Sequence, residues 1–277
     1  MSALKIADNK IFFKRSKKEK RLYTNITSIP NLLLKYITIN DEPLAYFDLK
    51  NSHPTFLADL IQTGYFNDCI DPVNFPENQK GVKFISNNNP TNYSNTSNFS
   101  NVNIPTSEFF DWVNVDSTSN NSQFKYKHEI DLPEDIKEFI ENAQKGKIYE
   151  WLQQVLHLES RAEAKQAMME LMYSSHKYHL GYKGYMQYMI PNVIQMVDNF
   201  KKKHTSKEFS IYLQKRESEI FIDRILMTLL KMGCSVLSKH DSIVFPISIK
   251  DTVEQVMREI LDEELGGYVL DFGTYKS

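Results

Sequence analysis

The sequence is poor in cysteine and contains no long apolar run. Its 277 residues include 2 cysteines, Cys69 and Cys234, which stand far apart and lack partners at the spacing of metal ligands. This usage argues against a disulfide scaffold or a structural zinc site and fits a reducing cytoplasm. No apolar stretch approaches the roughly 20 residues that span a bilayer, and the first residues contain no apolar signal core. We therefore predict a cytoplasmic protein with no membrane partner.

An excess of charge of one sign is also absent. The 33 Lys and Arg nearly balance the 35 Asp and Glu, giving a formal net charge of -2. A chain of this charge has no global basic field, so any nucleic acid would have to be held by local basic patches. One such patch is "KRSKKEKR", from Lys14 to Arg21. A solvated charged face is the alternative interpretation of this run.

Small polar residues fill one long stretch in the first half of the chain. From Ile85 to Gln123 the sequence consists largely of Asn, Ser and Thr, which bury too little apolar surface to form a core. We expect a loop or disordered insertion, placed at 67–130. It divides the chain into a first sheet segment at 1–66, a helical region at 131–210 and a second sheet segment at 211–277.

Local patterns predict a small sheet with helices. The apolar run from Leu44 to Phe47 fits a buried strand that ends at Asp48, and Pro54 follows near a helix start. Two apolar segments around Asp241 predict a hairpin with this residue at its turn. Further helices are expected at 134–200, 216–232 and 250–265, and a closing strand at 267–275. The fold class is α+β, with an inserted helical region between the sheet strands.

Asp48 and Asp241 are candidate metal ligands because each follows or joins apolar strand segments. Phosphoryl and nucleotidyl transfer often use two Mg²⁺ ions roughly 4 Å apart, held by a few carboxylates on rigid elements. Each Asp taken alone is equally well explained as an ordinary turn former. The constellation favours catalysis, because a cationic helix lies between the two Asp residues in the sequence.

Three segments resemble motifs of the family A DNA polymerases and the single-subunit phage-type RNA polymerases. "YFDLKNSHP" resembles the first palm motif, whose Asp, here Asp48, binds both metal ions. "RAEAKQAMMELMY" resembles the fingers motif R-x3-K-x7-Y and matches it at Arg161, Lys165 and Tyr173. "KHDSIVF" resembles the second palm motif with Asp241. The resemblance implies a palm built from 1–66 and 211–277 and a fingers region at 131–210.

Weaker matches extend the resemblance to nucleic-acid contacts. "KRLYTN", with Arg21, is similar to the segment that contacts the duplex near the primer end. The segment "YLQKRESEIFID" makes Gln214 a candidate for a minor-groove contact, and His240 is a candidate for the primer end. Alternatively, Arg21 belongs only to the solvated basic run, and His240 has a purely structural role.

The sequence departs from the family pattern around the expected sugar pocket. DNA polymerases of this type carry Glu where His53 stands, and the RNA enzymes carry Gly. Ser174 replaces the usual Gly after the fingers Tyr, and Lys20 replaces the Gly before Arg21. Ser242 after the hairpin Asp matches the RNA enzymes instead. The resemblance therefore leaves the choice between DNA and RNA open.

The spacing of the fingers-like helix suits a nucleotide. A helix rises about 1.5 Å per residue, so Lys165 and Tyr173 are ~12 Å apart, near the reach from the outer phosphates to the base. Arg161 and Lys165, at i and i+4, share a face. The resemblance implies that both bind the triphosphate, that Lys165 protonates pyrophosphate, and that Tyr173 and His53 shape the pocket. An amphipathic helix with an exposed basic edge is the alternative.

We therefore expect a nucleotidyltransferase that extends a nucleic-acid strand from nucleoside triphosphates with two Mg²⁺ ions, for which Mn²⁺ could substitute. Its partners would be a DNA or RNA template and primer, with an accessory protein supplying a thumb-like function. Two alternatives stand beside it. One is a non-catalytic nucleic-acid-binding subunit of a larger replication or defence complex. The other is a template-independent or primer-making nucleotidyltransferase.

Overall fold

A computed structural model of the chain describes residues 12–66, 69 and 132–275. The Asn-rich insertion predicted from the sequence lies outside the described residues. Among the helices of the described part, none is both long and apolar enough to cross a bilayer.

A small antiparallel sheet forms around strand β4 (Glu42–Leu49). Strands β6 (Ser242–Pro246) and β7 (Leu270–Thr274) pair with its two sides, β5 (Leu237–Lys239) pairs with β6, and β3 (Thr38–Ile39) pairs with the start of β4. The predicted closing strand is thus confirmed as β7. The strand predicted to end at Asp48 is also found, and pairing with β7 continues it by one residue, to Leu49.

The two faces of β4 serve different purposes. Ala45, Phe47 and Leu49 are buried in the main hydrophobic core, as the two-residue period of a strand requires. Leu44 belongs to a separate small cluster with Val244 of β6, on the opposite face. Asp48 shares the face of Leu44 by the same alternation. Its carboxylate therefore lies away from the main core.

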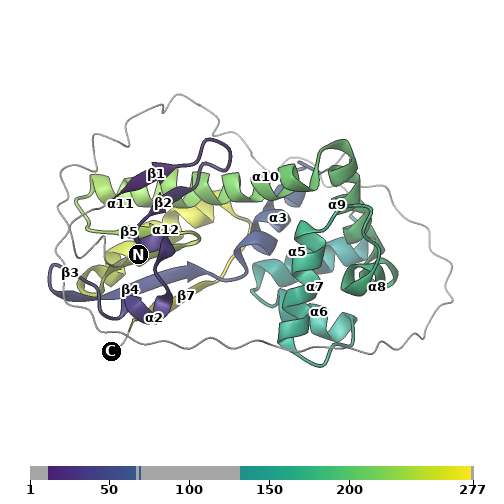
Figure 1. The fold of residues 1–277 in the computed structure, drawn as a ribbon, viewed down its shortest axis with the longest axis horizontal. Helices are drawn as coiled ribbons and strands as arrows, with labels where there is room; N and C mark the ends of the chain where they lie inside the picture. Colours follow the sequence, from purple (N-terminus) through teal and green to yellow (C-terminus); the bar gives the residue numbers. More distant parts are fainter. Residues whose placement is uncertain (1–11, 67–68, 70–131, 276–277) are drawn as a thin grey trace.

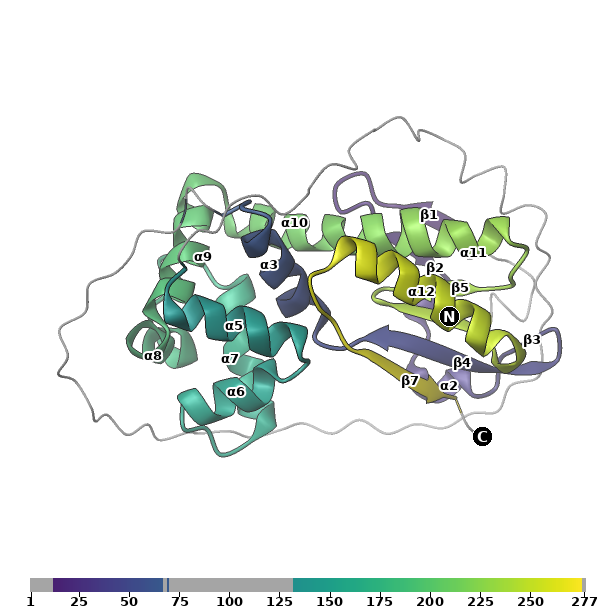
Figure 2. The same ribbon diagram turned by 180° about the vertical axis from the view of Figure 1, so that it is seen from behind.

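Long helices cover the core face of the sheet (Figures 1 and 2). A continuous helix is formed by α10 (Ser206–Ser218), the π-helical segment η3 (Glu219–Leu226) and α11 (Met227–Lys231). The predicted helix at 216–232 therefore starts about ten residues too late. Its true start is a capping box in which Thr205 and Glu208 bond each other's backbone N–H groups. Beside it, α12 (Lys250–Glu264) contacts β6 and η3 and confirms the predicted helix there.

A helical region is inserted between β4 and β5 and lies beside the sheet (Figure 1). Its helices, in chain order, are α3 (Ser52–Gln62), α5 (Glu134–Gln144), α6 (Ile148–Val155), α7 (Arg161–Tyr173), α8 (Gly181–Met189) and α9 (Pro191–Lys203). One continuous core includes residues of these helices and of the sheet. The predicted boundary at 210/211 falls inside α10, which runs along both parts, so the division into segments stays a prediction. The α+β class with an inserted helical region is confirmed.

The basic run near the start forms a hairpin that packs on the long helix. Strands β1 (Phe13–Arg15) and β2 (Leu22–Thr24) pair antiparallel. A 3-10 turn at Ile26–Ser28 and the short helix α2 (Asn31–Leu34) follow, and a second 3-10 turn, Ile247–Ile249, precedes α12. Arg15 lies 2.6 Å from Asp223 of η3. Part of the run therefore has a structural ion pair rather than a freely solvated charge.

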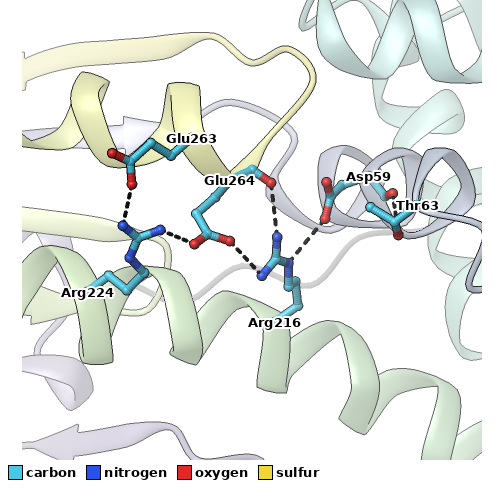
Figure 3. Close-up of polar contacts among 6 residues, drawn as sticks. All are labelled: Asp59, Thr63, Arg216, Arg224, Glu263 and Glu264. Atoms are coloured by element: carbon cyan, nitrogen blue, oxygen red, sulfur yellow. Dashed lines mark hydrogen bonds and ion pairs between the residues drawn. The ribbon is translucent and has the colours of Figure 1, made fainter. Parts of the chain in front are cut away.

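An ion-pair network ties α3, α10 and α12 together (Figure 3). Arg216 of α10 bonds Asp59 of α3 at 3.1 Å, and it also bonds the carboxylate and the backbone carbonyl of Glu264, each at 3.0 Å. Arg224 of η3 pairs with the same Glu264 and with Glu263. Because Asp59 and Arg216 are largely shielded from solvent, losing either side chain would leave the other charge without its partner at the contact between the helices.

Candidate functional site

Two acidic residues, Asp48 and Asp241, lie at adjoining ends of strands β4 and β6. Asp48 of β4 is in register with Ser242 of β6 on one side and with Asp271 of β7 on the other. Directly opposed residues in antiparallel strands project to the same face, so these three side chains form one row. Asp241, one residue before Ser242, accepts a backbone hydrogen bond from Leu49 at 3.1 Å. The structure therefore brings the two predicted metal ligands together, although 193 positions separate them in the sequence.

Asp48, Asp241 and Asp271 are together called the acidic row. The electrostatics around these carboxylates favour the binding of a cation. Burial, together with the nearby charges of Asp241, Asp271 and Glu217, raises the pKa of Asp48 to about 7. Burial also raises the pKa of Asp241, against the effect of a hydrogen bond with Ser52. Within the described residues, no hydrogen bond or ion pair joins the Asp48 carboxylate to another side chain. Clustered carboxylates without a cationic partner are a donor set that suits a hard divalent ion.

The described part of the chain has no group of three or more His, Cys, Asp or Glu side chains arranged to hold a metal ion by themselves. Mg²⁺ in nucleotide enzymes is commonly bound by one or two carboxylates, with phosphate oxygens and water completing its six ligands. The pair of Asp48 and Asp241 fits that pattern.

The hairpin turn that carries Asp241 has an unusual backbone. Lys239 and Ser242 pair, so His240 and Asp241 form a two-residue turn. His240 has φ of 58°, in the left-handed region that favours glycine. Burial lowers the pKa of His240, and the charge of Arg21 lowers it further. A histidine kept in a strained position here lies within electrostatic reach of the candidate site.

Glu217 is the hub of a second cluster next to the acidic row. Its carboxylate is 3% exposed and accepts a hydrogen bond from Arg21 at 2.8 Å. The Nε2 atom of His53 lies 3.3 Å from the same oxygen. Burial would raise the pKa of Glu217, but the hydrogen bond from His53 and the charge of Arg21 bring it below its usual value. The carboxylate is therefore charged at neutral pH and acts only as an acceptor.

His53 connects this carboxylate to Tyr173. Its Nδ1 atom lies 2.6 Å from the Tyr173 hydroxyl. Since Glu217 can only accept, we assign a proton to Nε2 of His53. In the neutral ring Nδ1 then has no hydrogen and accepts from the hydroxyl of Tyr173. The oxygen of Tyr173 consequently keeps its lone pairs for a further donor.

The cationic residues of α7 lie along one exposed edge. The helix begins where the Ser160 side chain accepts a hydrogen bond from the backbone N–H of Glu163, a cap that fixes its first turn. Arg161 pairs with Glu150 at 3.0 Å, and its guanidinium lies 4.8 Å from the centre of the Tyr149 ring. Lys165 is exposed, and the described residues supply no ion pair for it.

Tyr149 is the bridge from this edge to the acidic row. Burial raises its pKa, the charge of Arg161 lowers it, and that of Asp241 raises it. The Tyr149 hydroxyl therefore lies near enough to both Arg161, at the start of α7, and Asp241, in the hairpin turn, for their charges to affect its pKa. Besides burial, the charges of Tyr149 and Asp241 raise the pKa of Tyr173, so these residues lie near one another; their joint role in binding a nucleotide stays a prediction.

Gln214 is the predicted site residue with the least connection to this region. It lies on α10, and its backbone carbonyl accepts a hydrogen bond from Ser218. Among the described residues, no hydrogen bond or ion pair links its side chain to the clusters above. Its proposed contact with nucleic acid stays a prediction.

Three residues of the site escaped the sequence interpretation: Glu217, Asp271 and Tyr149. Glu217 had a signal, because it follows Leu213 by four positions and precedes Phe221 by four, in the apolar stripe of its helix. A Glu in such a stripe requires a partner. Asp271 was visible as a polar residue inside the predicted closing strand. Nothing in the sequence singled out Tyr149.

No family model and no curated protein matches the chain. Among solved structures, it is similar to the "POL domain of Pol1 from M. smegmatis complex with DNA primer-template and dNTP", at 13% sequence identity and a TM-score of 0.42. The alignment covers 100% of this chain and 50% of that one, so the chain spans half the length of that domain. A likeness of this degree adds nothing to the geometry described above.

Proposed function

We propose that the protein is a nucleotidyltransferase that extends a nucleic-acid strand from nucleoside triphosphates. One observation carries the proposal. Five residues selected from distant parts of the sequence lie in two adjoining clusters near the Leu49 end of the central strand β4: Asp48, Asp241, His53, Tyr173 and Arg21. Residues selected by chance from four segments would have no reason to meet.

In this proposal the acidic row is the reaction centre. Asp48 and Asp241 would hold Mg²⁺ ions, which lower the pKa of an attacking hydroxyl and neutralise phosphate charge when bound. The hydroxyl oxygen at the strand end forms a bond to the α-phosphorus, and the bond from that phosphorus to pyrophosphate breaks. The proton of the attacking hydroxyl passes to solvent water, and Lys165 would donate a proton to the pyrophosphate.

The remaining side chains would bind and orient the nucleotide. Lys165 and Arg161 lie on one face of α7 and would bind the triphosphate, Arg161 in exchange for its exposed pair with Glu150. Tyr173 would stack on the base or contact the sugar, with its hydroxyl oriented by His53. Basic residues near Arg21 would bind strand phosphates, so binding should weaken as salt increases.

Incorporation of labelled nucleotides tests the proposal. Ribonucleotides and deoxyribonucleotides are offered separately, on primed and unprimed templates, with Mg²⁺ or Mn²⁺. Asp48→Ala and Asp241→Ala should each reduce incorporation by roughly 10²-fold or more, because each removes charge stabilisation at the reacting centre.

Asp251→Ala is the matched control. Its side chain is 99% exposed at the start of α12, so its loss should leave incorporation and folding unchanged. Equal synthesis by the wild type and both site variants would contradict the proposal. Binding of a template without any synthesis by the wild type would favour a non-catalytic nucleic-acid-binding role instead.

A further inference from the structure

Two lysines are fully buried in the helical region, away from the acidic row. Lys183 of α8 is 0% exposed and Lys201 of α9 is 1% exposed. Lysine is almost never buried to this degree unless its ammonium group has partners, because removing the charge from water is costly. Both side chains therefore require an explanation that the proposed chemistry does not supply.

Their partners are backbone carbonyls at the end of α7. The ammonium of Lys201 donates to the carbonyls of Leu171 and Ser174 at 2.6 and 2.9 Å. The ammonium of Lys183 donates to the carbonyl of Ser175 at 2.9 Å and to Asp198 at 2.6 Å. The three carbonyls bracket Tyr173, the last residue of α7.

This end of the helix needs donors from elsewhere. The last carbonyls of a helix have no partner within it, and the last turn of α7 contains no basic residue of its own. Ser174 leaves the helix in an extended conformation, with φ of -71° and ψ of 159°. Lys201 thus supplies a donor to the Leu171 carbonyl of the last turn, and Lys183 binds the Ser175 carbonyl just after the helix.

Ion pairing alone does not explain how both buried lysine side chains are accommodated. Two lysines share one buried carboxylate, Asp198, which is paired with Lys183. Burial and the charge of Lys183 together lower the pKa of Lys201 to about 7, against the opposing effect of Asp198. Even a neutral amine has two N–H groups, enough for both carbonyls that Lys201 contacts. Its hydrogen bonds are therefore available in either protonation state.

The turn clamped by these lysines carries Tyr173, which the proposed function assigns to the nucleotide. Tyr173 points from it to His53, whose ring lies 2.6 Å from the Tyr173 hydroxyl. We propose that Lys201, supported by Lys183, is a positioning residue for the nucleotide pocket and acts by fixing the turn that carries Tyr173. This inference rests on the proposed function, because the pocket is that of the proposed nucleotide site.

A mutant cycle distinguishes positioning from general stability. Lys201→Met keeps the length and apolar stem of the side chain but removes every N–H donor. It should raise the KM for the nucleotide by about tenfold while kcat changes less, since two hydrogen bonds at the turn are lost. Lys202→Met, at the neighbouring exposed position of the same helix, is the control and should leave KM unchanged.

The same substitution is then made in Tyr173→Ala. If Lys201 acts through Tyr173, adding Lys201→Met to Tyr173→Ala should leave KM where Tyr173→Ala alone put it. A tenfold rise in both backgrounds would show a role independent of Tyr173 and overturn the inference. So would an unchanged KM in the single variant. If Lys201→Met does not fold, Lys183→Met, which removes the contact to Ser175, enters the same cycle.

Amide hydrogen exchange separates this inference from the proposed function. The Ser174 amide donates to the Glu170 carbonyl at 3.1 Å and should exchange faster in Lys201→Met than in the wild type or Lys202→Met. A wild type that incorporates no nucleotide contradicts the proposed function. An unchanged Ser174 exchange rate in Lys201→Met contradicts the clamp itself, whatever the activity.

Discussion

Glu217 offers a direct test of how the site is held together, because three segments meet at its carboxylate. Glu217→Ala leaves Arg21 without its ion-pair partner and His53 without its acceptor. Removing one partner of a fully buried pair costs about 3–5 kcal/mol. The side chain of Arg21 is 18% exposed, so water can solvate part of its charge. We therefore expect Glu217→Ala to lower the free energy of unfolding by about 2–4 kcal/mol.

Glu217→Gln refines the test. The amide oxygen still accepts from Arg21, but the charge is lost, so the expected cost falls to about 1–2 kcal/mol. Urea unfolding followed by circular dichroism measures both variants. Glu259→Ala, at an exposed position of α12, is the control and should stay within about 0.5 kcal/mol of the wild type. A loss below about 0.5 kcal/mol in Glu217→Ala would refute the assignment of Glu217 as the buried hub.

The pH dependence of this variant has a defined sign. The folded-state pKa of Glu217 is below its ordinary value, so the unfolded chain binds the proton more readily. The stability that Glu217 contributes is present above the unfolded pKa and is lost as the pH falls through the folded pKa. The difference between the wild type and Glu217→Ala should therefore shrink as the solution is acidified. A difference that grows in acid would show that the carboxylate is not stabilised by Arg21 and His53.

The remaining predictions concern stability at three other positions. The lowered pKa of Lys201 means that the unfolded chain binds more protons between about pH 7 and 10.5. Stability should therefore rise with pH in that window by about 1–3 kcal/mol, and Lys201→Met should abolish the rise in urea unfolding. Arg216→Ala should lower the free energy of unfolding by about 2–4 kcal/mol, because it leaves the Asp59 carboxylate unpaired. A loss below about 0.5 kcal/mol would show that the network of Figure 3 contributes little to stability. His240→Gly should raise the thermal midpoint through a gain of up to about 1 kcal/mol by relieving its left-handed backbone, and a lower midpoint would argue against strain there.

The parts of the fold that could be predicted from the sequence depend on short-range patterns. The hairpin at Asp241 and the helix α12 are set by alternation and helical periodicity within a few residues, and both were predicted. The start of α10 was also readable, because Thr205 and Glu208 form a capping-box pattern, but it was overlooked in a polar stretch. The last residue of β4, Leu49, was not predicted, since its place in the strand depends on pairing with Leu270 in a strand more than 200 residues away.

The candidate site shows the same division. Asp48, Asp241 and the α7 residues were found by motif and spacing. The cluster at Glu217 was not found, because its bond to Arg21 joins positions 196 residues apart and no local pattern encodes that contact. Likewise, the clamp on Tyr173 comes from lysines on two later helices. Long-range partners of buried charges are decided by tertiary packing, which a single sequence does not display.

The central claim is that Asp48 and Asp241 form one site for a divalent cation and a nucleotide. Titration of Mn²⁺, followed by electron paramagnetic resonance, tests it most directly in the wild type, Asp48→Asn and Asp241→Asn. The wild type should bind Mn²⁺ more tightly when a nucleoside triphosphate is present, because phosphate oxygens complete the ligand set. Each Asn variant should weaken that binding by about tenfold or more, as the loss of a charged ligand requires. Equal Mn²⁺ affinity in all three proteins, with and without nucleotide, would contradict the account.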